Sequence, residues 1–177
     1  MRKISLYIAA SLDGYIARPT GDTSWLQDER YTIAGEDFGY NSFLKTIDTT
    51  LMGNHTYQDI LGFEGPFPYQ GKTNYVFSRS SHPDTEHVRF VQHEPVGFVQ
   101  RLRQQTGPGI WLIGGSQLNT LFLNAKLIDE IILTCIPVIL GDGIPLFAPG
   151  ATETRLKLQE SKSYQNGFVQ LTYTPGA

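Results

Sequence analysis

Residues 4–17, which read ISLYIAASLDGYIA, carry the clearest fold signal in the chain. Residues 4–10 form a continuous apolar run of strand length, a pattern typical of a strand that is buried on both faces. Asp13-Gly14 is a turn signal, and residues 15–17 resume a short strand before Pro19. The stretch therefore predicts a buried strand with helices covering both sides of its sheet.

Beyond this stretch, apolar runs alternate with helical patterns. Strands are expected at residues 48–52, 74–77, 88–91 and 110–113. Helices are expected at residues 38–47, 54–61, 96–104 and 117–127. The side chain of Asn54 is expected to cap the second of these helices. The alternation predicts one α/β domain over residues 1–177, built on a mostly parallel central sheet.

The C-terminal part has a different pattern. Residues 130–140 form a long β-rich run that contains Pro137. Residues 155–160 and 168–173 alternate apolar and polar side chains, and Asn166-Gly167 lies between them. Asn-Gly between two alternating runs is a strong hairpin signal, so the chain is expected to end in an antiparallel hairpin.

Composition excludes several classes of protein. Hydrophobic residues make up 40% of the 177 residues and charged residues 18%, so charge-driven disorder is excluded. A net charge of −3 gives no electrostatic reason to expect a nucleic acid partner. Cys135 is the single cysteine, and His82, His87 and His93 have no ligand spacing, so neither a disulfide nor a metal site is expected.

No stretch approaches the roughly 20 apolar residues that a bilayer span needs. The apolar run after Arg2 and Lys3 is interrupted by Asp13-Gly14 too early for a signal peptide. The expectation is a soluble, cytoplasmic protein without a membrane partner.

Three polar segments follow expected strands directly. They are Gly53-Asn54-His55-Thr56, Ser78-Arg79-Ser80 and Gly114-Gly115-Ser116-Gln117. In open α/β sheets, ligands bind beyond the carboxyl ends of the strands. Glycine lets the backbone approach an anion, and a helix N-terminus offers free N–H groups. The glycines could instead serve only as tight turns, but the three segments together favour a long, phosphorylated ligand.

Arg79 adds chemical detail to this interpretation. A guanidinium flanked by two hydroxyls suits a phosphate monoester, although a solvated surface arginine would give the same sequence. Neither the G-x-G-x-x-G fingerprint nor a Walker P-loop is present.

Together these motifs resemble the dihydrofolate reductase superfamily. The resemblance rests on residues 8–17 and 51–57 and on Ile113-Gly114-Gly115-Ser116. Ser11-Leu12-Asp13-Gly14 and residues 136–147, IPVILGDGIPLF, are closer to the reductase domain of the bifunctional riboflavin-biosynthesis deaminase–reductase. The resemblance implies a three-layer sandwich with NADPH bound across the carboxyl edge of the sheet.

The resemblance also implies roles for individual residues in holding NADPH. Ala9 and Ile16 would line the nicotinamide pocket, and Ser78 and Arg79 would contact the adenosine 2′-phosphate. The diphosphate region would be held by Gly53, Asn54, His55, Thr56, Gly114, Gly115, Ser116 and Gln117. The family often has an arginine at the position of Asn54, so phosphate recognition there is expected to be weaker. Arg79 still favours NADPH over NADH.

Two carboxylates are candidate catalytic residues that would supply or steer a proton. Asp13 occupies a position that the riboflavin branch uses for its substrate, although an Asp-Gly turn explains it equally well. Asp37 has a spacing similar to that of the acid in dihydrofolate reductase, although a carboxylate at a helix start is also favoured by the helix dipole.

Three aromatic residues, Trp25, Phe38 and Tyr57, are candidates for binding the substrate. Trp25 would gate the site or anchor its loop, and the other two would line the substrate pocket or belong to the core.

The sequence thus predicts an NADPH-dependent reductase that transfers a hydride to a small heterocyclic or carbonyl-type substrate. The alternative is a non-catalytic nucleotide-binding module on the same fold. The resemblance also suggests a homodimer formed through residues 131–140 and the terminal hairpin. The alternative is a monomer that buries this run internally.

Overall fold

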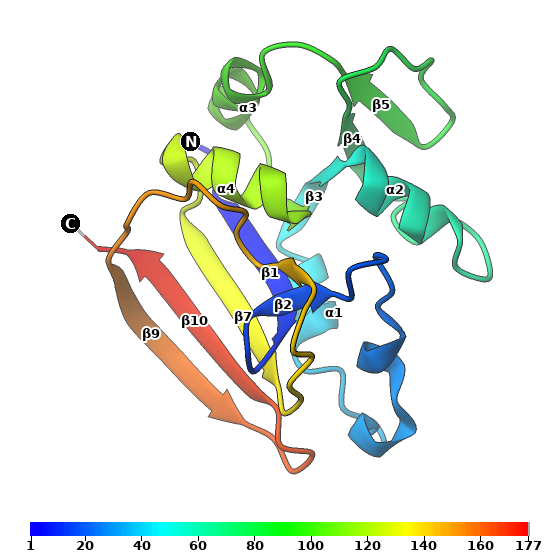
Figure 1. Cartoon of the computed structure of the whole chain (residues 1–177). Coiled ribbons are helices and arrows are strands. Elements are labelled where there is room, and N and C mark those ends of the chain that lie inside the picture. The colour runs from blue at the N-terminus through cyan, green and yellow to red at the C-terminus, as the bar shows by residue number, and fades with distance from the viewer. Residues whose placement is uncertain (177) are drawn as a thin grey trace.

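Eight strands form one mixed sheet in the computed structural model, which describes residues 1–176 (Figure 1). The strand order is β5-β4-β3-β6-β1-β7-β10-β9. The bounds are β1 Ile4–Ser11, β3 Ile47–Gly53, β4 Thr73–Phe77, β5 Val88–Val91, β6 Gly109–Gly114, β7 Glu130–Ile136, β9 Leu156–Ser163 and β10 Val169–Pro175. Neighbours from β5 to β7 run parallel, and β10 runs antiparallel to β7 and β9. The predicted α/β fold with an antiparallel terminal hairpin is confirmed.

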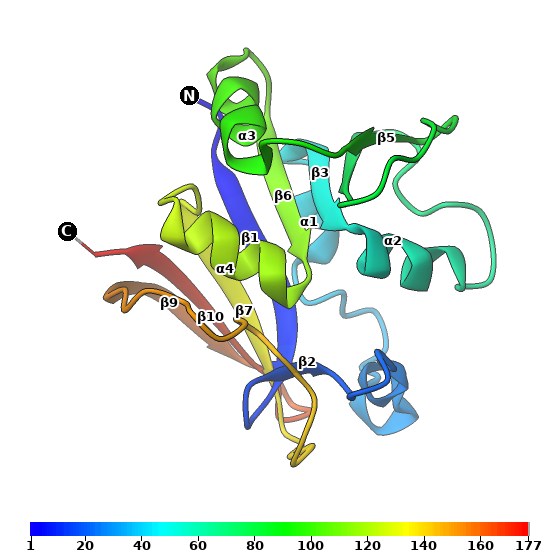
Figure 2. The same ribbon diagram turned by 45° about the horizontal axis from the view of Figure 1, so that its top comes forward.

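A second, two-stranded sheet pairs β2 (Tyr15–Ala17) with β8 (Ile144–Pro145). The remaining elements are the helices α1 Tyr40–Leu44, α2 Asn54–Leu61, α3 Pro95–Gln104 and α4 Ser116–Asn124, with short 3-10 turns at Ser24–Gln27 and Glu29–Tyr31. Figure 2 shows α3 and α4 in front of β1 and β6, with α1 behind the sheet. No helix within residues 1–176 is long and apolar enough to cross a membrane.

Alternate side chains of the central strands supply the two cores, because successive residues of a strand point to opposite faces. On the face of α3 and α4, Leu6 and Leu112 pack in one cluster with Phe122 of α4. On the other face, Trp111 packs with Phe43 of α1. The sheet is therefore the middle of three layers.

The prediction of a helix at residues 38–47 is wrong in the length of the helix, since α1 covers only Tyr40–Leu44. The Asp37 carboxylate accepts the backbone N–H groups of Gly39 and Asn41 and so fixes the helix start. At the other end the Thr46 hydroxyl donates to the carbonyl of Phe43, and β3 begins one residue later. Capping at both ends limits the helix to little more than one turn.

Further boundaries also differ from the sequence expectation: α4 ends at Asn124 rather than at residue 127, and β9 extends to Ser163 rather than ending at residue 160. Gly53, not Asn54, occupies the N-cap of α2, and no side chain caps that helix start. Strand β7 ends at Ile136 rather than at residue 140, because Pro137 has no N–H to donate to the ladder. The chain that follows, residues 137–143, is then free to turn back toward β2.

Asn74 joins several segments at the amino end of β4. Its side-chain amide donates to the carbonyls of Tyr69, Lys72 and His87 at 2.9–3.0 Å. Its Oδ1 accepts from the Thr50 hydroxyl at 2.7 Å, and the residue is 1% exposed. One buried amide therefore ties β3, β4 and the segment before β5 together.

We expect Asn74→Ala to lower the free energy of unfolding by about 2–4 kcal/mol, because it strands one buried hydroxyl and three carbonyls. Urea unfolding followed by circular dichroism measures the change. The matched control is Gln105→Ala, which removes an exposed amide and should change stability by less than about 0.5 kcal/mol. Equal effects of the two substitutions would contradict the structural role of Asn74.

Candidate functional site

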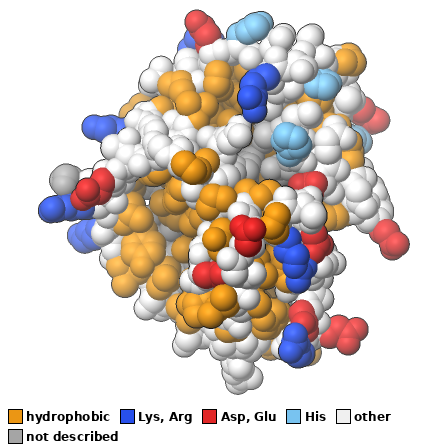
Figure 3. All heavy atoms as spheres, in the orientation of Figure 1, with side chains coloured by type: hydrophobic (Ala, Val, Ile, Leu, Met, Phe, Trp, Pro, Cys, Tyr) orange, Lys and Arg blue, Asp and Glu red, His pale blue; other side chains and the backbone are white. Residues whose placement is uncertain are grey.

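The carboxyl ends of β1, β3, β4 and β6 open onto one cleft of about 1180 Å³. Figure 3 shows a hollow near the middle of this face of the molecule, with hydrophobic side chains gathered below it. Of the residues that the sequence assigned to a cofactor, eleven line the cleft: Ala9, Ile16, Gly53, Asn54, His55, Thr56, Ser78, Arg79, Gly115, Ser116 and Gln117.

Two strand-to-helix turns meet at the centre of the cleft because β3 and β6 are neighbours. A Cβ built on Gly53 would lie 3.9 Å from the carbonyl oxygen of Gly114, and one built on Gly115 would lie 3.4 Å from Oγ1 of Thr56. Neither α2 nor α4 has a side-chain cap at its first turn. Free N–H groups of two helix N-termini therefore face one small region, which suits an anion.

Two polar atoms beside these turns lack a partner. Oγ of Ser116 and Oδ1 of Asn54 are buried without a hydrogen bond within residues 1–176, and both residues line the cleft. Buried polar groups are almost always hydrogen-bonded in folded proteins. Their position makes them available to a polar ligand that lies across the turns.

Arg79 lies at the end of the cleft formed by β4 and α4. Its guanidinium donates to Oε1 of Gln117 at 3.3 Å, and its carbonyl accepts from the Gln92 side chain at 3.3 Å. Ser78 and Ser80 flank it in the lining. The cationic group is thus held against the first turn of α4 with further N–H donors free to bind a phosphate.

The β2–β8 sheet forms a second wall. Ile144 and Pro145 line the cleft beside Ile16, and Gly143 allows this close approach of β8 to β2. A Cβ on Gly143 would lie only 2.3 Å from the carbonyl of Ala17, so no other residue fits without moving the chain. These residues were not predicted as part of the site, because their pairing with β2 is a contact between segments that are distant in the sequence.

Gly114 differs from its neighbours in the same turn. It adopts φ of +113°, a conformation that favours glycine. A Cβ there would lie 3.1 Å from Oδ1 of Asn119, so a side chain at this position would point toward α4, and Gly114 is not among the residues that line the cleft.

Neither candidate catalytic carboxylate lines the cleft. Asp13 accepts hydrogen bonds from the Ser11 hydroxyl at 2.6 Å and from the backbone N–H groups of Leu140 and Gly141 at 3.1 and 2.8 Å. These bonds, that of Ser11 first, hold the pKa of Asp13 below its usual value. Backbone N–H groups of Asn41 and Gly39 likewise lower the pKa of Asp37.

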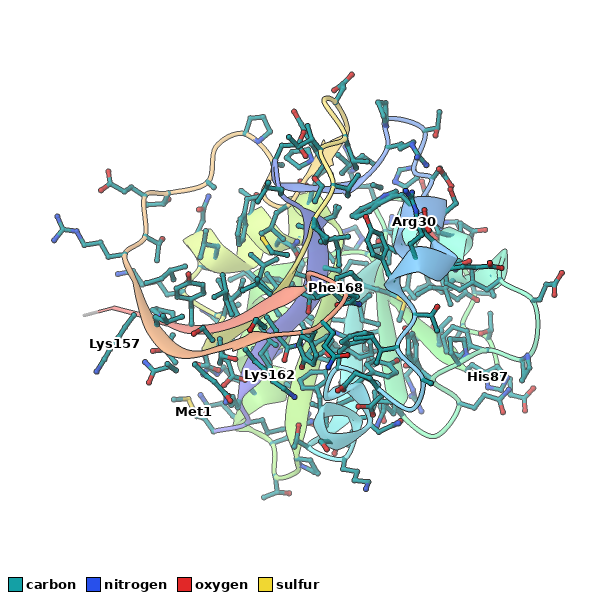
Figure 4. All side chains as sticks on the ribbon, turned by 90° about the horizontal axis from the view of Figure 1, so that it is seen from below. Met1, Arg30, His87, Lys157, Lys162 and Phe168 are labelled. Atoms are coloured by element: carbon teal, nitrogen blue, oxygen red, sulfur yellow. The ribbon has the colours of Figure 1, made fainter. Side chains whose placement is uncertain are left out.

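The three aromatic candidates for substrate binding are also not among the residues that line the cleft. Trp25 is 6% exposed and packs with Ile136 and Phe168. The ring centroids of Phe38 and Phe168 are 5.0 Å apart. Figure 4 shows Phe168 beside the turn that joins β9 to β10. Tyr57 packs with Met52 in the core beneath α2. Each side chain anchors a segment near the cleft without forming its wall.

Asp59 is a cleft residue that was not predicted from the sequence. It lies four residues after His55 on α2, and both side chains line the cleft. Partial burial raises the pKa of Asp59, and the nearby His55 opposes that shift. The i,i+4 spacing from a residue already assigned to the site is the sequence signal that would have found it.

This sheet and cleft define an α/β protein of the dihydrofolate reductase-like class. The chain belongs to the RibD C-terminal domain family, which it matches over residues 2–170. The resemblance inferred from the sequence motifs is therefore confirmed. The family suggests an oxidoreductase.

Known proteins agree with this assignment. The chain is 44% identical to the uncharacterized protein YwjB of Bacillus subtilis over 176 residues, with 97% of each chain covered. A putative riboflavin biosynthesis protein from Shewanella sp. PV-4 superposes with a TM-score of 0.88 at 28% identity and covers all of both chains. A deaminase/5-amino-6-(5-phosphoribosylamino)uracil reductase from Thermotoga maritima shares the fold at 16% identity, with a TM-score of 0.73. That match covers 99% of this chain and 57% of the Thermotoga chain.

We expect Asp13→Asn to lower the melting temperature near pH 6, because an amide cannot replace a carboxylate that accepts three hydrogen bonds. Since the folded-state pKa of Asp13 is lowered, its stabilising effect is present above the unfolded value of about 3.8 and is lost as the pH falls through the folded pKa. Melting curves from pH 3 to 7 should show the two proteins converging at the acid end. A constant difference in melting temperature between the two proteins from pH 3 to 7 would contradict this role of the Asp13 carboxylate.

Proposed function

We propose that this chain is an NADPH-dependent reductase that transfers a hydride to a small heterocyclic or carbonyl-type substrate. The observation that carries the proposal is the contact between the two strand-to-helix turns, together with Arg79, which follows β4 and is hydrogen-bonded to Gln117 of α4. Two helix N-termini suit a diphosphate, and a guanidinium between two serines suits the separate 2′-phosphate that distinguishes NADPH from NADH.

The residues present fit this cofactor. The unpaired Oγ of Ser116 lies where it can donate to a phosphate oxygen, and Gly53 and Gly115 leave room for one to approach. Ala9 and Ile16 offer an apolar wall for the nicotinamide ring. When bound, NADPH supplies the hydride that is added to a substrate carbon, while a proton is added to the neighbouring nitrogen or oxygen.

The residues of the chain would bind the cofactor and the substrate, orient them toward each other and exclude water from the cleft. We assign Asp13 a positioning role, because it holds residues 140 and 141 and so places Gly143 and Pro145 against β2. We propose that Asp37 fixes the start of α1 and that Trp25, Phe38 and Tyr57 support the segments around the cleft. The lone Cys135 suits the reducing cytoplasm, where we propose that the protein acts.

We expect Arg79→Gln to weaken NADPH binding about tenfold and to leave NADH binding unchanged, because only NADPH carries the phosphate that the guanidinium contacts. Titration with each dinucleotide, followed by nicotinamide fluorescence, measures both affinities. The matched control is Arg89→Gln, which removes an exposed arginine outside the cleft.

An equal loss for both dinucleotides would exclude Arg79 as a reader of the 2′-phosphate. If NADPH binds tightly but no substrate in a screen leads to its oxidation, the result would favour the non-catalytic nucleotide-binding module instead.

We also propose that the protein is a homodimer formed through one face of β7, β10 and β9. Cross-strand pairs place Leu133 with Leu171 and Tyr173 with Leu158 on one face, toward α4. Leu156, Leu158 and Val169 are 37–49% exposed there. Figure 3 shows hydrophobic side chains gathered over these strands. An apolar face of this kind can pair with its own copy around a two-fold axis.

The opposite face of β9 is polar, with Lys157 paired to Thr174 and Lys162 to Gln170; Figure 4 shows both lysines on this strand. We therefore expect Leu158→Glu to convert the dimer to a monomer and Lys157→Glu, on the other face, to leave it intact. Sedimentation velocity measures both. A wild-type protein that sediments as a monomer would contradict this interface.

A further inference from the structure

A second, smaller cavity of about 190 Å³ lies between the segment of the two 3-10 turns and the terminal hairpin, because residues from 26 to 38 and Phe168 line it. Within residues 1–176, only Leu26 lines both this cavity and the cleft. Pockets for cofactors and larger ligands usually measure about 300–1000 Å³, so this cavity suits only a small molecule.

The terminal hairpin holds the opposite wall of the cavity at two points. The side-chain amide of Asn166 donates to the carbonyl of Tyr31 at 2.7 Å, and that of Gln170 donates to the carbonyl of Phe38 at 3.1 Å. Phe168, which is 6% exposed, lies between these two anchoring residues in the sequence. The two walls are therefore fixed to each other without a ligand, which lowers the entropic cost of binding one.

Three aromatic rings meet at the cavity. The ring centroid of Phe168 lies 5.2 Å from that of Tyr31 and 5.0 Å from that of Phe38, and all three residues line the cavity. Aromatic rings attract cations through their quadrupole. The same aromatic cluster already binds one, since Nζ of Lys162 lies 4.6 Å from the centroid of the Tyr164 ring, which packs edge-on against Phe38.

The charged side chains in the lining are both carboxylates, Asp28 and Glu36, and no lysine or arginine is among the described residues that line the cavity. Asp28 is paired at 2.6 Å with Arg30, whose side chain is 83% exposed. One oxygen of Glu36 accepts the backbone N–H of Phe38 at 2.8 Å, and no other hydrogen bond or ion pair to this carboxylate occurs within residues 1–176. The wall therefore offers a carboxylate oxygen beside aromatic rings.

We propose that this cavity binds a small organic cation of the quaternary ammonium type. Aromatic rings bind a methylated ammonium group by cation–π attraction and apolar contact, and the Glu36 carboxylate balances its charge. A metal ion fits less well, because within residues 1–176 no three metal-ligating side chains come together. This site goes beyond the proposed reductase activity and does not depend on it, since the cavity shares only Leu26 with the cleft.

The test is isothermal titration calorimetry of the whole chain at constant ionic strength with three probes. Choline carries a trimethylammonium group, 3,3-dimethylbutan-1-ol has the same shape without the charge, and phosphocholine adds a phosphate. We expect choline to bind at millimolar concentration and the neutral alcohol to bind about tenfold more weakly, because both attractions need the positive charge. Phosphocholine should also bind more weakly than choline, since its phosphate would meet Asp28 and Glu36; this distinguishes a free cation from a lipid headgroup.

Two substitutions in the lining test the location of the bound choline. Glu36→Gln keeps an oxygen for the N–H of Phe38 and removes the charge, whereas Tyr31→Leu removes one ring and keeps the carbonyl that is bonded to Asn166. We expect each to weaken choline binding about fivefold. The matched control is Glu86→Gln, which removes a carboxylate that is 88% exposed and lines neither the cavity nor the cleft, and it should leave the affinity unchanged.

Equal affinity for choline and the neutral alcohol, binding of phosphocholine as tight as that of choline, unchanged choline affinity in Glu36→Gln, or no choline binding at millimolar concentration would each overturn the proposal. Melting curves show whether each variant is folded, and Glu36→Gln, which preserves the hydrogen bond to Phe38, decides the outcome if Tyr31→Leu does not fold. None of these results bears on NADPH binding, which is measured separately.

Discussion

The contact between the β3–α2 and β6–α4 turns is the constraint on which the cleft depends. Parallel pairing of β3 with β6 brings two helix N-termini to the same edge of the sheet, one from each covering layer. Gly53 and Gly115 keep the turns close enough for their backbones to form one surface. If either turn moved outward, the free N–H groups would no longer converge, and Arg79 would lose its position relative to them.

The rest of the fold supports this edge from a distance. Asn74 fixes the amino end of β4 and thereby the strand that carries Arg79 at its other end. Asp13 holds the chain after β7 so that Gly143 can lie against Ala17 and complete the cleft wall. These polar side chains act on the backbone, so their effect on a ligand is indirect, through the shape of the cleft.

Much of this arrangement could be predicted from local sequence patterns. The strands at residues 74–77 and 110–113 were predictable because their apolar runs end in glycine or serine, and strand ends in a parallel sheet meet at one edge. The placement of Asn54, Arg79 and Ser116 followed from that rule alone. The ends of α1 and β7 were not predictable from periodicity, since they depend on the Asp37 cap and on Pro137. Gly143 was missed because its role arises from a contact with Ala17, which is far away in the sequence. Asp59 was missed although its i,i+4 spacing from His55 is a local signal.

A crystal structure of the chain with NADP⁺ is the most direct test of the account. We expect the diphosphate to lie between the turns at Gly53 and Gly115, with the 2′-phosphate within hydrogen-bonding distance of Arg79 and the nicotinamide ring beside Ala9. A dinucleotide bound elsewhere, or with its 2′-phosphate far from Arg79, would contradict the central claim.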